Sequence, residues 1–375
     1  MTDRLSIKNF AQIGSVDLEF ADLTVLVGAQ GTGKSLALQW LKIALDGPLA
    51  IQTLADAGNL ASGDWSELLF GRGMVRSPKT RVAWNGDAVQ TSWPIWRTKR
   101  RERLYFIPAH RSLLVDQGWP LPLEKFDWRT PFVARRFSHS LFELFRDSER
   151  GPLFPGPRRL SPLLRQSIDD AVFHGGSVRI GEERSQRLLQ LTHGKAVLPF
   201  MVWTSGQREF APLLMGLYQL VPEGRQARVE SVDWVVIEEP EMGLHPQAIS
   251  VVMLLVLDLM RRGYRVVLST HSPHLLTAVW MLQRLKDFRA RWQLVCDGFG
   301  IASRRDAKAL AEVALAKSYR VHLLEFGKGD KVFAKDISGL NPGAEDDAES
   351  GWGGLTGFSS KFGEAVRKAA NEVDS

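Results

Sequence analysis

The glycine-rich segment Gly28–Ser35 is the feature that most limits what this chain can fold into. It reads GAQGTGKS and matches the pattern G-x-x-x-x-G-K-[ST] at every fixed position. Residues 23–27 before it are apolar and predict a buried strand. The leucine spacing from 38 to 45 predicts a helix that ends at Asp46-Gly47-Pro48. A strand that enters and a helix that leaves are the context that a phosphate-binding loop requires.

The backbone amides of such a loop turn toward phosphate oxygens at the positive end of a helix dipole. Lys34 is expected to reach the β- and γ-phosphates, and the Ser35 hydroxyl to ligate Mg²⁺. A glycine-rich turn that binds nothing is the alternative, but the complete motif with its flanks favours a nucleoside triphosphate with Mg²⁺. The candidate nucleotide-binding residues of the loop are Gly28, Gln30, Gly31, Thr32, Gly33, Lys34 and Ser35.

The composition is that of an ordinary globular protein and excludes several classes. The 375 residues are 44% hydrophobic and 24% charged, which allows a sizeable core. The net charge of +6 is compatible with nucleic acid but does not demand it. The single cysteine, Cys296, excludes an internal disulfide and a multi-cysteine zinc site. No apolar run approaches a membrane span and no signal peptide is evident, so we expect a cytoplasmic protein without membrane contact.

A second strong signal is a pair of acids at the end of an apolar run. Residues 232–237 predict a buried strand, followed by Glu238 and Glu239 and then by the segment PEMGLHP. Glu238 is expected on the Mg²⁺ side of the site, and Glu239 is expected to polarise the attacking water as a general base. The alternative is that two acids only mark the exposed end of a strand. The phosphate-binding loop upstream favours the catalytic interpretation.

Two weaker signals lie on either side of this acidic segment. Residues 265–268 predict a strand that ends in the segment STHSP, where His271 can contact a γ-phosphate or its water. Ser205, Gly206 and Gln207 precede an apolar helical pattern at 210–220. A serine there could be an ordinary helix N-cap.

Together these segments resemble the ABC-type ATPases of the SMC/RecF/OLD class. The N-terminal stretch LSIKNFAQIGSVDLEFADLTVLVGAQGTGKS is similar to their opening, and SGQ, EPEMGLHP and THSP resemble their later motifs. Gln30 stands where the class usually has Asn, and Glu238 where many members have Asp. The resemblance implies an α/β fold. It implies a P-loop ABC-type ATPase head with an N-terminal β-hairpin layer, a central mixed sheet and an inserted helical lobe.

The implied division is a discontinuous ATPase core at 1–111 and 200–325, a mainly helical lobe at 112–199 and a tail at 326–375. The lobe carries helical patterns at 137–150 and 160–173 and a hairpin at 177–191. A strand is expected at 292–296. The tail is expected to end in an amphipathic helix at 358–372 that contacts a partner. The strand at 104–107 leads to the place where the class has a glutamine, and no glutamine is found there.

The resemblance implies an ATPase in which two subunits close head to tail around ATP. Ser205, Gly206 and Gln207 would contact the γ-phosphate held by the other subunit, and His271 would sense it. A homo-oligomer, either a dimer or a larger even assembly, follows from that arrangement.

Two interpretations of what closure controls stay open. The first is regulation of an effector protein encoded nearby, a toxic nuclease, in anti-phage defence systems such as PARIS or Septu. No nuclease domain of the OLD type is recognised in the last hundred residues, so the chain resembles a stand-alone OLD-like ATPase. The second is a RecF-like ATPase that binds DNA in repair, favoured by the basic charge and the cluster RTKRRER at 97–103. A transporter subunit and a P-loop kinase fit the motifs less well.

Overall fold

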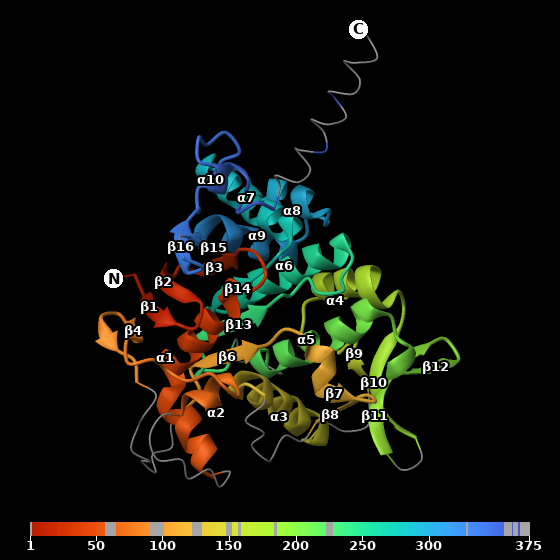
Figure 1. Ribbon diagram of the computed structural model, residues 1–375. Coiled ribbons are helices and arrows are strands. Elements are labelled where there is room, and N and C mark those ends of the chain that lie inside the picture. The colour runs from red at the N-terminus through yellow and green to blue at the C-terminus, as the bar shows by residue number, and fades with distance from the viewer. Residues whose placement is uncertain are drawn as a thin grey trace.

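A ten-stranded mixed sheet forms the centre of the molecule (Figure 1). The computed structural model describes residues 2–56, 65–90, 101–121, 130–147, 152–156, 159–183, 186–222, 228–327 and 329–355, with 362 and 367. The strand order is β5-β4-β1-β2-β16-β15-β3-β14-β13-β6. The predicted α/β class with a central mixed sheet is confirmed.

Five neighbouring strands of this sheet are parallel and almost wholly buried. They are β15 (Tyr319–Phe326), β3 (Leu23–Val27), β14 (Arg265–Ser269), β13 (Trp234–Glu238) and β6 (Leu104–Ile107). In the register, Leu26 lies opposite Ser269, and Ser269 lies opposite Glu238. The carboxyl ends of β3, β14 and β13 therefore meet at one edge, where open α/β sheets carry their sites.

The other half of the sheet is built on the predicted N-terminal hairpin and is antiparallel except for the parallel pair β16–β2. It contains β1 (Arg4–Phe10), β2 (Ile13–Glu19), β4 (Arg81–Trp84), β5 (Asp87–Ala88) and β16 (Val332–Asp336). Asn85 and Gly86 both have positive φ and form the tight turn between β4 and β5. Strand β16 comes from the segment expected to be a tail, yet it pairs with β15 and β2 inside the sheet.

Helices cover both faces because neighbouring residues on each buried strand point to opposite sides. Val235 and Ile237 pack in one core cluster, and Trp234 and Val236 pack in the other. The first cluster includes residues of α5 (Ser205–Leu220), α6 (Pro246–Arg261), α7 (Pro273–Asp287) and α9 (Arg305–Ala316). The second includes residues of α1 (Lys34–Asp56) and α2 (Ser66–Phe70).

The first helix is interrupted where its end was predicted, at Asp46-Gly47-Pro48. Asp46 has non-helical φ and ψ of −128° and 17°, and α1 consists of two helical stretches that meet at this kink, the second running to Asp56. The buried Asp46 carboxylate accepts hydrogen bonds from the amides of Arg103 (2.9 Å) and Leu104 (3.0 Å), which hold the kink against β6. Pro48 is tolerated because it falls in the first turn after the kink, where its missing N–H is not needed.

The segment between β6 and α5 contains more strand than the sequence indicated. The predicted helices and hairpin are present as α3 (Phe132–Asp147), α4 (Pro162–Ile168), a π-helix η2 (Asp169–Phe173), β10 (Ser177–Glu183) and β11 (Gln186–His193). Strands β9 (Pro152–Phe154) and β12 (Ala196–Pro199) extend the hairpin to a four-stranded antiparallel sheet. Each added strand has at most four residues, too few for a clear alternating pattern. The 3₁₀ turns η1 (Arg111–Leu114) and η3 (Phe200–Val202) and the strand pair β7 (Val115–Asp116) and β8 (Trp119–Pro120) complete this region.

The strand predicted at 292–296 is also wrong, because this segment begins helix α8 (Gln293–Phe299). A short apolar run does not distinguish a strand from a buried helix, and here packing against α7 and α9 decides for the helix. The short α10 (Asp347–Ser350) follows β16. Of the predicted helix at 358–372 only residues 362 and 367 are described, and both are helical; residues 97–100 of the basic cluster lie outside the described residues. Among the helices described, none has the length and apolar content needed to cross a membrane.

Candidate nucleotide-binding and hydrolysis site

The phosphate-binding loop has a backbone that requires glycine at two positions. Gly28 has a φ of 144°, and a Cβ atom there would lie 2.1 Å from the carbonyl oxygen of Leu324 in β15. Gly33 has a φ of 81°, which L side chains rarely adopt. Within the loop, Thr32 Oγ1 donates to the carbonyl of Ala29 at 2.8 Å. The loop is therefore closely packed against the sheet, while Gln30, Gly31 and Ser35 are exposed.

Lys34 is the point at which the loop meets the other predicted motifs. Its buried ammonium group donates to the carbonyls of Gly28 (2.9 Å) and Ala29 (3.1 Å) and lies 3.0 Å from His271 Nε2. Burial lowers the pKa of Lys34, and the nearby carboxylates of Glu239, Glu241 and Glu238 oppose that shift. The three acids thus favour the charged form of the Lys34 ammonium group, which is the form that binds phosphate.

Glu238 has the surroundings of a metal ligand. Its Oε2 accepts from the Ala109 amide at 3.3 Å, and the Ser35 hydroxyl lies close enough to oppose the rise of its pKa. Its Oε1 is buried and has no hydrogen-bond partner among the described residues. Burial raises the pKa of Glu238. A hydroxyl and a carboxylate oxygen are hard ligands, so Ser35 and Glu238 fit Mg²⁺, which would also hold the carboxylate charged.

Glu239 follows β13 directly and has a positive φ of 43°. Its backbone amide donates to Ser269 at 3.0 Å, and its Oε1 lies 3.4 Å from His271 Nε2. Burial is the largest cause that raises the pKa of Glu239 to about 7, followed by the negative charge of Glu241. A carboxylate with a pKa near neutrality can accept a proton from water, as a general base does.

The backbone amide of His271 is hydrogen-bonded, and its imidazole lies near both Lys34 and Glu239. Its amide donates to Glu241 Oε1 at 2.7 Å. Burial, and then the charge of Lys34, lower the pKa of His271. The imidazole is therefore neutral at pH 7, and its Nε2 can accept a hydrogen bond from Lys34.

The structure also brings Arg111, which the sequence analysis did not select, to the same edge. Its buried guanidinium donates to the backbone carbonyls of Glu238 (2.8 Å), Pro108 (3.1 Å) and Glu239 (3.3 Å). The neighbouring Ser112 hydroxyl donates to Glu209 on α5. Arg111 thus ties the end of β6 to the end of β13. An arginine shortly after a strand-ending proline was the only signal in the sequence.

The SGQ segment begins α5 and is separate from this cluster. Thr204 is the N-cap, and it forms a reciprocal capping box with Gln207. The Gln207 side chain also donates to the Val172 carbonyl at 3.1 Å, so its amide is used within the protomer. Ser205 is exposed and lines a pocket of about 250 Å³ with Gly206 and residues 243–245. No hydrogen bond or ion pair between described residues joins the SGQ segment to the phosphate-binding loop.

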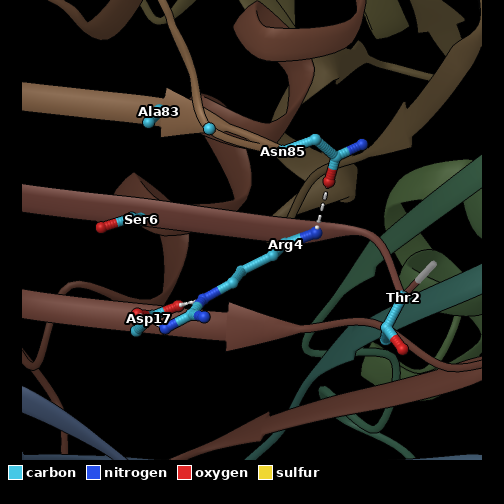
Figure 2. A pocket seen from close by; sticks show the side chains of 7 residues that line it. Thr2, Arg4, Ser6, Asp17, Ala83 and Asn85 are labelled. Carbon is cyan, nitrogen blue, oxygen red and sulfur yellow. Dashed lines mark hydrogen bonds and ion pairs between the residues drawn. The ribbon is translucent and has the colours of Figure 1, made fainter.

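A larger hollow of about 500 Å³ lies over β1, β2 and β4 (Figure 2). Its Arg4 side chain is already paired with Asp17, and the Arg4 amide donates to Asn85 at 2.8 Å. The charged groups there are therefore used within the sheet, and this hollow is not the candidate site.

The comparisons with known proteins agree with the motifs. Residues 95–277 match the protein family described as "AAA domain, putative AbiEii toxin, Type IV TA system". The matched range includes the SGQ, acidic and histidine segments and begins after the phosphate-binding loop. A stretch of 109 residues is 29% identical to the Old nuclease of Escherichia phage P2, and it covers 29% of this chain and 18% of the nuclease. The chain therefore spans less than a fifth of that relative.

Two solved structures were found among the similar folds. The SMC head domain from Thermotoga maritima has a TM-score of 0.36 and 11% identity, and the match covers 89% of this chain and 98% of that chain. The Smc head domain with an extended coiled coil, bound to the C-terminal domain of ScpA from Pyrococcus furiosus, has a TM-score of 0.37 and 11% identity. That match covers 89% of this chain and 96% of the other.

Proposed function

We propose that this chain, which matches an AAA-domain family over residues 95–277 and the Old nuclease over 109 residues, is an ATPase of the SMC/OLD-like ABC type that binds ATP with Mg²⁺ and hydrolyses it. The observation that carries the proposal is the meeting of Lys34, Glu238, Glu239 and His271 at one edge of the sheet. A cation, two carboxylates and a neutral imidazole are the groups that phosphoryl transfer to water requires.

Each group has one role in this proposal. The amides of the phosphate-binding loop and Lys34 bind the phosphates. Ser35 and Glu238 would hold Mg²⁺, which neutralises charge on the phosphates when bound. Glu239 accepts the proton of the attacking water, and His271 orients that water or the γ-phosphate oxygen. Together the groups cleave ATP to ADP and phosphate.

The exposed position of Ser205 supports closure of two copies head to tail. A side chain at the N-terminus of α5 that contacts no phosphate-binding residue of its own protomer is available to a neighbouring one. Ser205 and Gly206 would supply the second half of the pocket, with Gln207 holding the helix start. In this arrangement the core at 1–111 and 200–325, together with β16, forms the dimer, and exposed parts of 112–199 and of the segment after β16 would contact partners.

We propose regulation of a toxic effector in the cytoplasm as the use of this cycle. The support is the toxin and type IV toxin–antitoxin wording of the matched family and the match to a phage nuclease. Glu102 and Arg103 of the basic cluster form ion pairs within the protein, which favours a structural role over contact with DNA. Arg103 pairs with Asp233, and Glu102 pairs with the buried Lys42 at 2.6 Å.

The test uses the purified full-length chain. We expect Mg²⁺-dependent release of phosphate from ATP, and we expect a non-hydrolysable ATP analogue to convert the protein to a dimer or a larger even assembly in light scattering. An analogue-bound monomer would overturn the head-to-tail proposal. Steeply salt-dependent binding to duplex DNA would instead favour the RecF-like alternative.

A further inference from the structure

Glu241 lies two residues after the proposed base and has no role in the function described so far. Its Oε1 accepts two hydrogen bonds from the chain that follows β14. One comes from the Thr270 hydroxyl at 2.6 Å, and the other from the His271 amide at 2.7 Å. These are the short distances expected when a carboxylate is the acceptor. One oxygen atom thus joins the loop after β13 to the loop after β14.

The second loop is fixed around this contact. Thr270 is fully buried, and its Oγ1 also accepts from the Ser272 amide at 2.9 Å. Ser272 in turn is the N-cap of α7. The backbone on both sides of His271 is therefore tied down, and Glu241 is the partner that comes from the acidic loop. The His271 imidazole is thereby placed with its Nε2 3.0 Å from Lys34 Nζ and 3.4 Å from Glu239 Oε1.

Glu241 also lies beside the reacting groups of the site. Oε2 of Glu241 is buried, and its carboxylate lies close enough to that of Glu239 to raise the pKa of Glu239; its charge also acts on Lys34. Two buried carboxyl groups so close together are unfavourable for stability. Its position next to the reacting groups indicates that the loop is arranged for the site.

We infer that Glu241 is a positioning residue, which holds the His271 imidazole between Lys34 and Glu239 by accepting the Thr270 hydroxyl and the His271 amide. The inference rests on the proposed ATP hydrolysis. It assigns Glu241 no contact with the nucleotide or with Mg²⁺. Loss of the anchor would let the ring move, and a displacement of about 1 Å can cost on the order of 100-fold in rate.

Two substitutions at Glu241 separate hydrogen bonding from packing. Glu241→Gln keeps an oxygen that accepts both hydrogen bonds, so we expect kcat within about threefold of the wild type. Glu241→Ala removes the acceptor, and we expect kcat to fall by about 100-fold while the Kd for ATP changes by less than about threefold. Glu312→Ala, which removes an exposed i,i+4 ion pair with Lys308 on α9, is the matched control and should behave as the wild type.

A second variant and a second measurement distinguish the loss of this anchor from a general folding defect. Thr270→Val keeps the shape of the buried side chain and removes one donor to Glu241, and it should lower kcat by about tenfold. Amide hydrogen exchange of the 269–275 segment should be slow in the wild type and in Glu241→Gln, and fast in Glu241→Ala. Wild-type kcat in Glu241→Ala, equal losses in both Glu241 variants, or unchanged exchange would overturn the inference.

The two proposals fail in different ways. Absence of ATP hydrolysis by the wild type would overturn the proposed function. The exchange measurement would still decide whether Glu241 anchors the His271 amide, because it needs no turnover.

Discussion

Lys34 Nζ and His271 Nε2 lie 3.0 Å apart although 237 positions separate the two residues in the chain. Strands β3 and β14 are parallel neighbours, so their carboxyl ends bring the phosphate-binding loop and the histidine loop together. Lys34 is the proposed phosphate-binding group, and His271 is proposed to contact the γ-phosphate or the attacking water, so the pair places both groups beside the same phosphate.

Lys34→Ala should abolish nucleotide binding. The ammonium group is within electrostatic reach of Glu239, Glu241 and Glu238, and its loss leaves their negative charge opposed to a triphosphate. We expect the Kd for ATP to rise by at least about 100-fold, in line with the loss of a charge-assisted contact. Calorimetric titration measures this, with the exposed Lys8→Ala as a control for net charge. Unchanged affinity would remove Lys34 from the site.

Glu239→Gln should separate binding from hydrolysis. The amide cannot accept the proton of the attacking water, while the isosteric side chain keeps the packing beside His271. We expect ATP binding like that of the wild type and a loss of turnover of about 100- to 10,000-fold. The variant should also accumulate as the closed oligomer with ATP in size-exclusion chromatography. Turnover at the wild-type rate would mean that another group is the base.

A mixing experiment tests whether Ser205 acts on a neighbouring copy. Ser205→Arg should spoil the surface offered to the partner, and Lys34→Ala should spoil the loop that holds the phosphates. Each variant alone should be inactive. A mixture should recover about a quarter of the wild-type activity per chain, because half of the random dimers contain one intact composite site. No recovery in the mixture, with dimers present, would contradict composite sites.

Arg111→Met should weaken the fold near the site. The guanidinium donates to three backbone carbonyls, and the methionine leaves those buried acceptors without a donor. We expect a loss of about 2–4 kcal/mol in the free energy of unfolding, since hydrogen bonds from charged groups contribute more than neutral ones. Urea unfolding measures it. The exposed Arg101→Met is the control, and an equal effect of both would exclude a special role for Arg111.

The local motifs could be predicted from the sequence because each has its own pattern. The phosphate-binding loop, the strand before Glu238 and the strand before His271 are short segments whose composition and spacing indicate both the element and its end. Contacts across the sheet have no such pattern. Asp46 kinks α1 because of amides 57 and 58 positions away, and Glu241 finds its partners about 30 positions further along. Arg111 was missed for the same reason, since its acceptors are backbone carbonyls of another strand.

The last prediction concerns stability at acid pH and the buried His322 of β15. Its Nε2 lies 2.8 Å from the Glu19 carbonyl, and burial is the largest cause that lowers its pKa below the ordinary 6.5. Asp336 and Glu19 favour the protonated form and Arg320 opposes it, so the net direction is set by burial.

A lowered pKa in the fold means that the unfolded chain takes up its proton at a higher pH than the folded chain. The free energy of unfolding should therefore fall as the pH is lowered from 7.0 through 6.5 toward the folded pKa of His322. The slope should approach about 1.4 kcal/mol per pH unit for this one proton. His322→Gln can still donate to Glu19 but does not titrate, so its urea unfolding should lose this part of the slope between pH 7 and pH 5. Identical pH dependence in the variant and the wild type would show that the pKa of His322 in the folded protein is the ordinary one.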